Sequence, residues 1–443
     1  MSLALSLDNR AAGHAGALTE KETNALKKLW LKLFELFEQP GRDYTPPAPK
    51  AAEPEKKSGG GFFGFGKKEE KEQDVFLGAT ADPEWMSLPL EKALPLIPGS
   101  MLRRTFWSMV ATDNPDSAVL RFLRARKWDF DAAYKMLANT LRWRLAMRVD
   151  DITALGESGL HEELNRLKPG MGDMFITQLH SGKATLGGPD KASRGICFIN
   201  VQLHKKEEQT FEVIRLLTLY IMETSRLFCG HPMDNACIVF NLENFTLANM
   251  DYDFVKFLIS CLEAYYPETL GLCCIHKAPW VFSTVWAVIN PLLDPVVASK
   301  LQFTKNLDDL TKFIDIGSLP VIISGNPNSK TKDEATKVDP PKAGSLERRN
   351  TPAVEQYDRI VRDYELLTTE WAKMTTEQND EKDALSRLEK GRWYRIARIK
   401  AEADLRGPTI YHAKGLIKLT PEGRLFIDFG GENWVEQDIT ERV

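Results

Sequence analysis

Apolar residues recur at the spacing of an α-helix near the start of this chain. Residues 18 to 39 open with a capping box, Thr19-x-x-Glu22, and then place leucine, tryptophan and phenylalanine along one face. Further apolar residues make this stripe wider than a simple surface helix needs. The pattern favours a helix that packs on the rest of the protein; a helix that lies on a membrane surface is the alternative.

Proline, glycine and charged residues dominate positions 40 to 75, which predicts a disordered linker between the N-terminal helical region, residues 1 to 39, and the rest of the chain. The run GFFGFGKK in this linker half-matches a phosphate-binding loop. Lys68, however, stands where Ser or Thr must bind magnesium, and no strand precedes the run, so we reject the match. Its phenylalanines, set among lysines, are candidates for contact with a membrane or a partner.

Helical periodicity returns after the linker and continues to about residue 150. Asn114-Pro115-Asp116 has the form of a helix cap followed by a first turn. Asp129 or Asp131 then caps a longer helix. The sequence therefore predicts a small module made of helices alone.

Strand-like and helix-like runs alternate through the middle of the chain. Apolar runs at residues 196 to 201, 236 to 242 and 270 to 275 predict buried strands, and helical patterns at 210 to 228 and 247 to 262 separate them. Strands that alternate with helices predict βαβ units and a mostly parallel sheet. The expected fold class is therefore α/β.

One later helical pattern, residues 279 to 290, carries bulky apolar residues on more than one face. Pro279 marks its start and Pro291 follows its end. A fully buried core helix explains such a pattern, and so does a helix that lies over an apolar ligand and moves. The residues that follow, 294 to 303, predict a turn that leads into another strand.

The last quarter of the chain predicts a linker, residues 331 to 350, and a mainly helical extension, residues 351 to 443. Thr351 starts a long helix whose pattern is interrupted near Asn379. The strand-like run at residues 425 to 429 has no obvious partner. The long helix either packs on the lobe built from the strands, which we favour, or pairs with another chain.

The composition excludes several classes of protein. A net charge of −4 over 443 residues gives no nucleic-acid footprint. No apolar run reaches the roughly 18 residues of a membrane span, and the first residues lack the basic and apolar regions of a secretory signal. The six cysteines form no C-x-x-C pair and predict reduced core thiols in a cytosolic protein. The scattered histidines predict no metal site.

The common signatures of enzymes are missing together. The chain has no G-x-S-x-G nucleophile elbow, and His161-Glu162 lacks the second histidine of H-E-x-x-H. The one G-x-G-x-x-G run lies in the linker with no strand before it. We therefore expect no enzymatic activity and no cofactor.

Three ordered motifs, YYPE-x-x-G, HKAPW and LLDPVVASK, resemble the lipid-binding half of the CRAL-TRIO family, the Sec-fourteen type of lipid transfer protein. Upstream, LRFLRARKWDFDAAYKMLANTLRWR resembles the helical N-terminal module of that family. The resemblance covers about residues 82 to 325. It implies a helical module at residues 76 to 150 and a lipid-binding domain at residues 151 to 330. In that domain a mostly parallel sheet forms the floor of a lipid pocket, and the helix at 279 to 290 is the gate that closes it.

The resemblance also implies a site for a lipid headgroup. Arg126, Glu268 and Lys300 match the motif positions that hold a phosphoinositide headgroup, and Lys127 is adjacent. Arginine and lysine neutralise a phosphodiester, while a carboxylate accepts hydrogen bonds from inositol hydroxyls. A solvated surface network is the alternative for these residues. The candidate residues of the pocket and gate are aromatic: Phe240, Phe257, Trp280, Phe282 and Trp286.

The chain departs from the family pattern at three places. Val297 replaces a threonine near the headgroup lysine and removes a phosphate donor. Ala236 and Ile238 replace two hydroxyl side chains that contact the phosphate of phosphatidylcholine in founding members of the family, so this lipid is not an expected ligand. In the turn at residues 190 to 195, Ser193 and Gly195 take the places of a glycine and a proline, so a different turn geometry is expected.

The activity implied by the resemblance is exchange of phosphatidylinositol between membranes without a chemical step. Squalene is a candidate for a second, hydrophobic lipid. The competing interpretation is an interaction module that presents phosphatidylinositol to a lipid kinase, or tethers a signalling complex, through the C-terminal helices. Either would work in the cytoplasm with transient, peripheral contact to membranes such as the endoplasmic reticulum, endosomes or lipid droplets.

Overall fold

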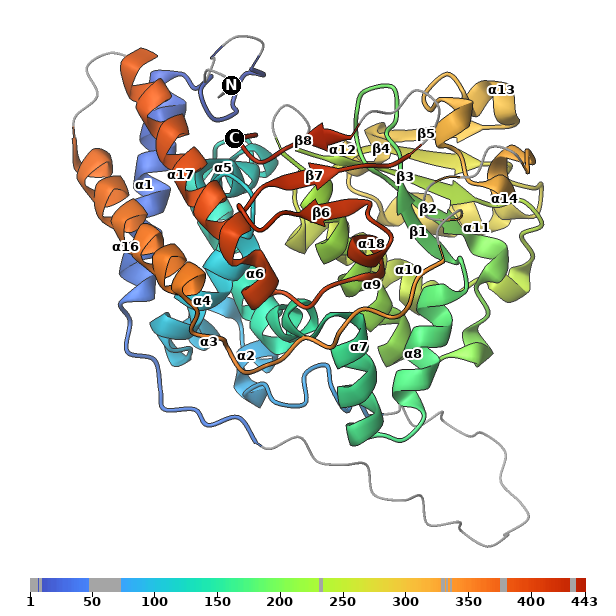
Figure 1. Ribbon diagram of the computed structural model, residues 1–443, viewed down its shortest axis with the longest axis horizontal. Helices are drawn as coiled ribbons and strands as arrows, with labels where there is room; N and C mark the ends of the chain where they lie inside the picture. The colour runs from blue at the N-terminus through green and yellow to red at the C-terminus, as the bar shows by residue number, and fades with distance from the viewer. Residues whose placement is uncertain are drawn as a thin grey trace, which may run out of the picture.

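The computed structural model describes residues 7, 10–47, 73–230, 234–327, 331, 334, 337–374, 381–430 and 436–443. Most of the predicted linker at 40 to 75, with its phenylalanine-rich run, lies outside the described residues. The described chain forms a helical lobe and a lobe built on a β-sheet, which lie side by side (Figure 1). The predicted α/β fold is confirmed.

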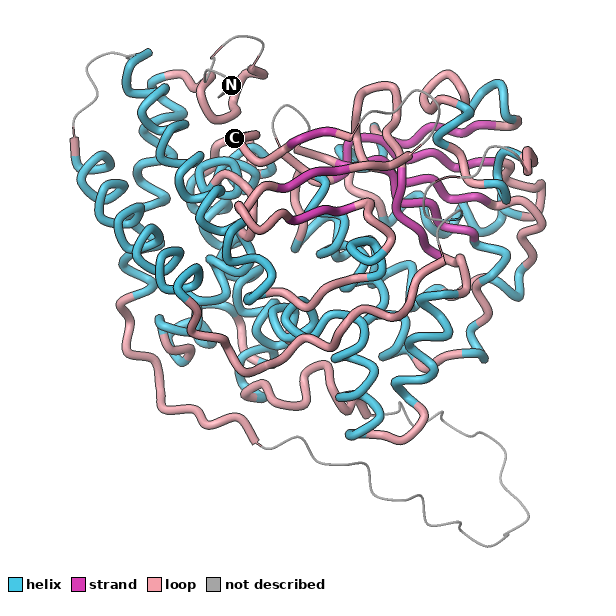
Figure 2. The backbone as a smooth tube through the Cα atoms, viewed as in Figure 1, coloured by secondary structure: helices cyan, strands magenta, loops and turns pink. Residues whose placement is uncertain are grey.

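A five-stranded sheet organises the second lobe (Figure 2). The strands follow one another across the sheet in chain order; β1 is antiparallel to β2, and all other neighbours are parallel. The strands are β1 (Ala184–Gly187), β2 (Ile196–Asn200), β3 (Ala236–Asn241), β4 (Leu270–His276) and β5 (Leu301–Thr304). The mostly parallel sheet and its three predicted strands are thus confirmed.

The two faces of the sheet have different partners, because successive side chains of a strand point to opposite faces. Cys237 and Val239 of β3 belong to a cluster that packs on short segments after β5. Ile238 and Phe240 lie on the other face, among the side chains of α11. The helices that follow β5 are α13 (Leu307–Leu310) and α14 (Val321–Ser324).

Two helices of this lobe, α7 (Val149–Leu167) and α8 (Met171–His180), precede β1. The helices between its parallel strands are α9 (Phe211–Ser225), α10 (Tyr252–Ser260), α11 (Phe282–Ile289) and the short α12 (Pro295–Ser299). The predicted helix at 247 to 262 is broken, because Asp251 caps α10 and a π-helical turn, Cys261–Tyr265, follows it. Of the turn and strand predicted at 294 to 303, the strand is confirmed as β5, but the turn is wrong: Asp294 caps the short helix α12, with Pro295 at its first position.

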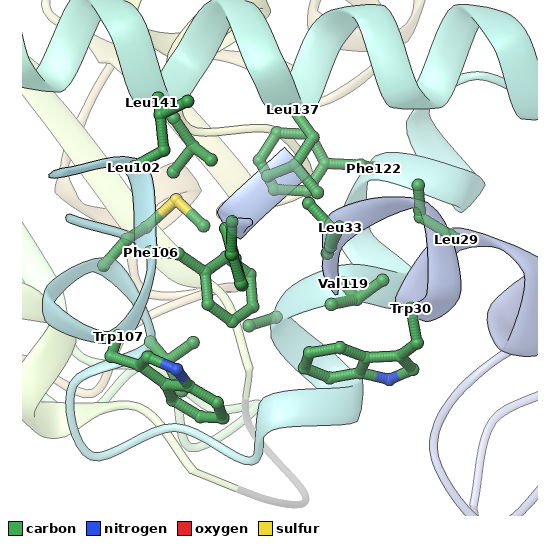
Figure 3. Close-up of a cluster of buried hydrophobic side chains, with 14 of the residues drawn as sticks. Leu29, Trp30, Leu33, Leu102, Phe106, Trp107, Val119, Phe122, Leu137 and Leu141 are labelled. Carbon is green, nitrogen blue, oxygen red and sulfur yellow. The ribbon is translucent and has the colours of Figure 1, made fainter. Parts of the chain in front are cut away.

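The helical lobe has its own apolar core, into which the N-terminal helix packs. Its helices are α1 (Glu20–Phe37), α2 (Pro83–Ser87), α3 (Leu90–Ala93), α4 (Gly99–Val110), α5 (Pro115–Ala125) and α6 (Phe130–Ala146). Figure 3 shows Trp30 and Leu33 of α1 beside Phe106 and Val119, and all four are fully buried. The capping box and the packed helix are confirmed, and the membrane-surface alternative is not.

The long C-terminal helices pack on this helical lobe. Helix α16 (Pro352–Lys373) lies along α1, and α17 (Glu381–Leu405) packs against α16 and α5. The Asp116 carboxylate joins these elements: it accepts hydrogen bonds from Trp30, from Tyr364 and, at 2.6 and 3.0 Å, from Arg387. The long helix therefore packs within its own chain, but on the helical lobe and not on the sheet lobe that we expected.

The end of the chain forms a second, three-stranded sheet. It contains α18 (Ile410–Ala413) beside β6 (Ile417–Leu419), β7 (Leu425–Ile427) and β8 (Gln437–Asp438). β7 pairs with β6 and β8, so the strand-like run that lacked a partner in the sequence has two. The two ends of the chain lie close together (Figure 1), and the Arg10 side chain donates a hydrogen bond to the Val443 carbonyl.

Candidate functional site

A largely apolar cavity lies between the sheet and helices α9, α10 and α11. It comprises about 1800 Å³ of unfilled space, part of which is open to solvent. Ile238 and Phe240 of β3 contribute to its floor, Ile214 and Leu217 of α9 to a wall, and Phe282 of α11 to its cover. Such a space suits the chains of an apolar ligand.

Helix α11 covers the cavity with one face and is exposed on the other. Val285 is fully buried, and Phe282 and Trp286 line the cavity. On the opposite side, Val288 is 49% exposed, and Leu292 just beyond the helix is 44% exposed. The fully buried core helix considered from the sequence is therefore wrong. The helix lies over an apolar space and presents apolar side chains to solvent.

The predicted pocket and gate residues divide into two groups. Phe240, Phe282 and Trp286 line the cavity. Phe257 and Trp280 do not: Phe257 packs against the cluster formed by α9 and its neighbours, and Trp280 is 86% exposed. The spacing of apolar residues in the sequence could not separate these two groups, because the strands and helices of this region have apolar residues on more than one side.

The four basic residues of the run LRFLRARK, which are Arg121, Arg124, Arg126 and Lys127, also divide into two groups. Arg121 and Arg124 are held in the structure: Arg121 binds Asp113 and the Asp234 carbonyl, and Arg124 lies 3.4 Å from the Asp234 carboxylate. Arg126 and Lys127 are exposed, and neither side chain forms a hydrogen bond or ion pair with any described residue. The two side chains whose charge is unpaired among the described residues are therefore Arg126, which matches the headgroup motif, and its neighbour Lys127.

The structure places Glu268 and Lys300 at one edge of the sheet. Glu268 comes two residues before β4, and Lys300 comes directly before β5, where its carbonyl accepts from Cys273 of β4. Arg121 of α5 donates to the Glu268 carbonyl, which holds the end of α5 next to this edge. The side chains of Glu268 and Lys300 form no ion pair with each other or with Arg126 among the described residues, so the surface-network alternative has no support here.

The residues that depart from the family pattern lie at the cavity. Ala236 and Ile238 belong to its lining, as does Val297 of α12. None of the three side chains offers a hydrogen bond to a phosphate.

A cluster of polar residues in the cavity wall was not predicted from the sequence. Lys183, His204, Asn249 and Asp251 all line the cavity and are all buried. Burial lowers the pKa of Lys183 to about 8. Burial opposes ionisation of Asp251, but His204 and the Phe254 N–H hold the pKa of this carboxyl below its ordinary value. No motif marks these residues: His204 follows the predicted strand at 196 to 201, and Asn249 and Asp251 lie within the predicted helix at 247 to 262.

Comparison with known protein families gives two matches. The CRAL/TRIO domain matches residues 179–325. The CRAL/TRIO N-terminal domain matches residues 67–139. Among the described residues, no helix is both long and apolar enough to cross a membrane.

Three curated proteins show how far the similarity extends. A phosphatidylinositol transfer protein, CSR1 of Eremothecium gossypii, is 32% identical and is covered over 99% of its length by 92% of this chain. A CRAL-TRIO domain-containing protein of Schizosaccharomyces pombe is 39% identical over 61% of this chain, which spans 59% of that protein. Another from the same organism is 30% identical over 71% of this chain and 86% of its own length.

Proposed function

Because this chain belongs to the CRAL-TRIO family, we propose that it binds phosphatidylinositol in the cavity under α11 and carries it between membranes. The observation that carries the proposal is the cavity itself, an apolar space covered by a single short helix. Lipid exchange needs a cavity that opens and closes. It needs no bond to be made or broken, so no catalytic step is proposed.

The acyl chains would occupy the apolar part of the cavity. Each buried CH₂ group stabilises the bound lipid by roughly 0.8 kcal/mol, so two long chains supply ample free energy. A headgroup-free hydrocarbon such as squalene would use the same space without the charged edge. We therefore propose that such a lipid competes with phosphatidylinositol for the cavity.

The inositol headgroup would sit at the edge where β4 and β5 begin. Arg126, Lys127 and Lys300 provide positive charge for the phosphodiester, and Glu268 provides an acceptor for inositol hydroxyls. What supports this assignment is that these side chains lack partners among the described residues. In contrast, Arg121 of α5, the helix that ends next to Arg126, forms ion pairs with the carboxylates of Asp113 and Asp234.

The outer face of α11 would touch the membrane when lipid is exchanged. Trp280, Val288, Leu292 and Val296 are exposed on α11 and the segments on either side of it. A contiguous group of exposed apolar side chains is typical of a surface that meets a membrane. The protein would therefore work in the cytoplasm and bind membranes peripherally.

The interaction-module interpretation is not favoured. Its sequence support was a C-terminal helical region free to bind a partner. In the structure α16 and α17 pack on α1 and α5, and Arg387 of α17 is bound to Asp116. Among the described residues, therefore, no observation supports docking to a lipid kinase.

The test is the identity of the lipid that the purified protein takes from vesicles containing equal amounts of phosphatidylinositol and phosphatidylcholine. Native mass spectrometry should show one phosphatidylinositol per chain. Phosphatidylcholine should be absent, because Ala236 and Ile238 cannot donate to its phosphate, and each lost charged hydrogen bond costs about 1.5–3 kcal/mol. Recovery of phosphatidylcholine alone would contradict the proposed function.

A further inference from the structure

The cavity is covered by a segment that connects two neighbouring strands. This cover segment, residues 278–299, lies between β4 and β5 and contains α11 and α12. Phe282 near its start and Val297 near its end both line the cavity, so the cover extends past α11. The chain is fixed to the sheet at both ends of the segment, because the backbone of Lys277 pairs with β5 and that of Lys300 with β4.

The hydrogen bonds of the cover segment are local, with one exception. Among the described residues, every other hydrogen bond made by residues 278–299 joins positions at most four apart in the chain. The exception is the Asp294 N–H group, which donates to Oε1 of Glu263 at 2.6 Å. Beneath the segment the contacts are apolar, as where Phe282 packs on Phe245. One polar contact therefore holds the middle of the cover segment to the rest of the lobe.

Glu263 lies in the π-helical turn that follows α10. This turn, Cys261–Tyr265, is closed by the Tyr266 N–H, which donates to the Cys261 carbonyl at 2.8 Å. Single π-helical turns are rare and frequently mark functional sites. Here Leu262 lines the cavity, and the carboxylate of the next residue, Glu263, reaches the cover segment. The turn thus places a wall residue and a charged acceptor side by side.

The bond lies among the apolar side chains that we expect to touch the membrane. Glu263 is half-buried and Asp294 is exposed, so the bond is open to its surroundings. Leu292 and Val296, two positions to either side of Asp294, are 44% and 46% exposed. Entry of these two side chains into a membrane would draw the Asp294 backbone away from Glu263. Burial of two apolar side chains gains more free energy than the loss of one exposed hydrogen bond costs.

We propose that Glu263 is a latch: its hydrogen bond to Asp294 keeps the cover segment closed in water and breaks when the segment meets a membrane. Release at a membrane rests on the proposed function, whereas closure in water does not depend on which lipid is carried. A carboxylate suits this role, because a hydrogen bond to a charged acceptor is stronger than one to a neutral acceptor. Because the bond is exposed, breaking it leaves no buried charge, and the fold survives the opening.

The experiment measures amide hydrogen exchange in the full chain without vesicles. Glu263→Ala removes the acceptor and should raise exchange in α11 and α12 roughly fivefold, which is the effect of one typical hydrogen bond on an opening equilibrium. Glu263→Gln keeps an oxygen acceptor without the charge and should raise exchange by less. Amides of α5 should not change in either variant. Unchanged exchange in α11 of Glu263→Ala would overturn the proposal, and so would an equal rise in α5, because Glu263 would then only stabilise the fold.

A matched control removes another half-buried carboxylate that accepts from a backbone N–H group. Asp309 accepts from the Lys305 N–H at 3.2 Å and belongs to α13, on the face of the sheet opposite the cavity. Asp309→Ala should leave exchange in α11 unchanged. A rise in α11 as large as that in Glu263→Ala would refute the assignment of the latch to Glu263.

Vesicles of phosphatidylcholine and phosphatidylinositol test release at a membrane. They should raise exchange in α11 of the wild-type protein, but much less in Glu263→Ala, where the latch is already absent. An equal rise in both proteins would contradict release of the latch by the membrane.

Phosphatidylinositol transfer is measured in parallel and separates the two proposals. If the wild-type protein carries no phosphatidylinositol but Glu263→Ala shows the selective rise in α11, the proposed function fails and closure by the latch remains. If transfer is normal but Glu263→Ala leaves exchange in α11 unchanged, the proposed function stands and the latch fails.

Discussion

Ser193 adopts a left-handed backbone conformation, with φ of 67°, in the turn before β2. Glycine accepts this region freely, whereas a residue with a Cβ atom is strained there. The Asp190 carboxylate holds the turn by accepting from the backbone N–H groups of Ala192 and Arg194. Serine therefore adopts here a conformation that is natural to glycine.

Replacing Ser193 by glycine should therefore stabilise the protein. We expect Ser193→Gly to raise the free energy of unfolding by about 0.5–1 kcal/mol in urea titration, with the relief of strain partly offset by glycine entropy. Ser193→Ala serves as the control, because it removes the hydroxyl but keeps the strain. A loss of stability in the glycine variant would show that the turn does not strain its residue.

Arg144 of α6 forms a buried ion pair with Glu223 of α9. The Nη1 and Oε1 atoms are 2.8 Å apart, both side chains are 1% exposed, and the Tyr266 hydroxyl donates to the same carboxylate. Removing the arginine leaves a buried carboxylate without its main partner. Arg144→Met should lower the free energy of unfolding by about 3–5 kcal/mol. Arg166→Met removes an exposed pair with Glu163 and should change it by less than about 1 kcal/mol.

The same pair predicts how stability depends on pH. Burial opposes ionisation of Glu223, but the positive charges of Arg144 and Arg226 outweigh this and lower its pKa to about 2. Because the folded pKa lies below the unfolded value, this contribution is complete above about pH 5 and is lost as pH falls toward 2. In Arg144→Met that acid-dependent part of the stability should shrink. An unchanged acid profile would show that the pair does not stabilise the fold.

At the scale of elements, α11 is the part of the structure expected to move. It is eight residues long, it carries exposed apolar side chains, and it covers the apolar cavity. Contact with phosphatidylinositol-containing vesicles should therefore raise amide hydrogen exchange within α11 selectively, since opening exposes its backbone to water. Amides of α5 in the helical lobe provide the internal control. Equal exchange in α11 with and without vesicles would show that it is not a gate.

Periodicity and capping residues predicted most of the helices and strands, but not the short helix α12 or which side chains face the cavity. The strands β2, β3 and β4 were found because buried parallel strands are continuous apolar runs. The short helix α12 was missed although Asp294 and Pro295 form a cap and first turn. Phe240 lines the cavity and Phe257 does not, yet the sequence could not tell them apart, because the face that a side chain occupies depends on neighbouring elements. His204 and Asp251 carried no motif, so the sequence did not mark them as cavity residues.

At the scale of the whole molecule, the C-terminal extension completes the helical lobe. Asp116 is bound by Trp30 of α1, Tyr364 of α16 and Arg387 of α17, so three segments distant in sequence meet at one buried carboxylate. The sequence could not predict this arrangement, because it depends on contacts between residues 86, 248 and 271 positions apart. The consequence for function is that these helices stabilise the lobe beside the cavity.

Phosphatidylinositol transfer between vesicles tests the central claim most directly. The double variant Glu268→Ala with Lys300→Ala should fold normally and abolish transfer, because it removes the proposed partners of the inositol hydroxyls and the phosphodiester. The matched control is Glu91→Ala with Lys135→Ala, which removes an exposed ion pair of the helical lobe and should leave transfer unchanged. Binding of a headgroup-free hydrocarbon should survive in both. Normal phosphatidylinositol transfer by the first double variant would contradict the proposed headgroup site.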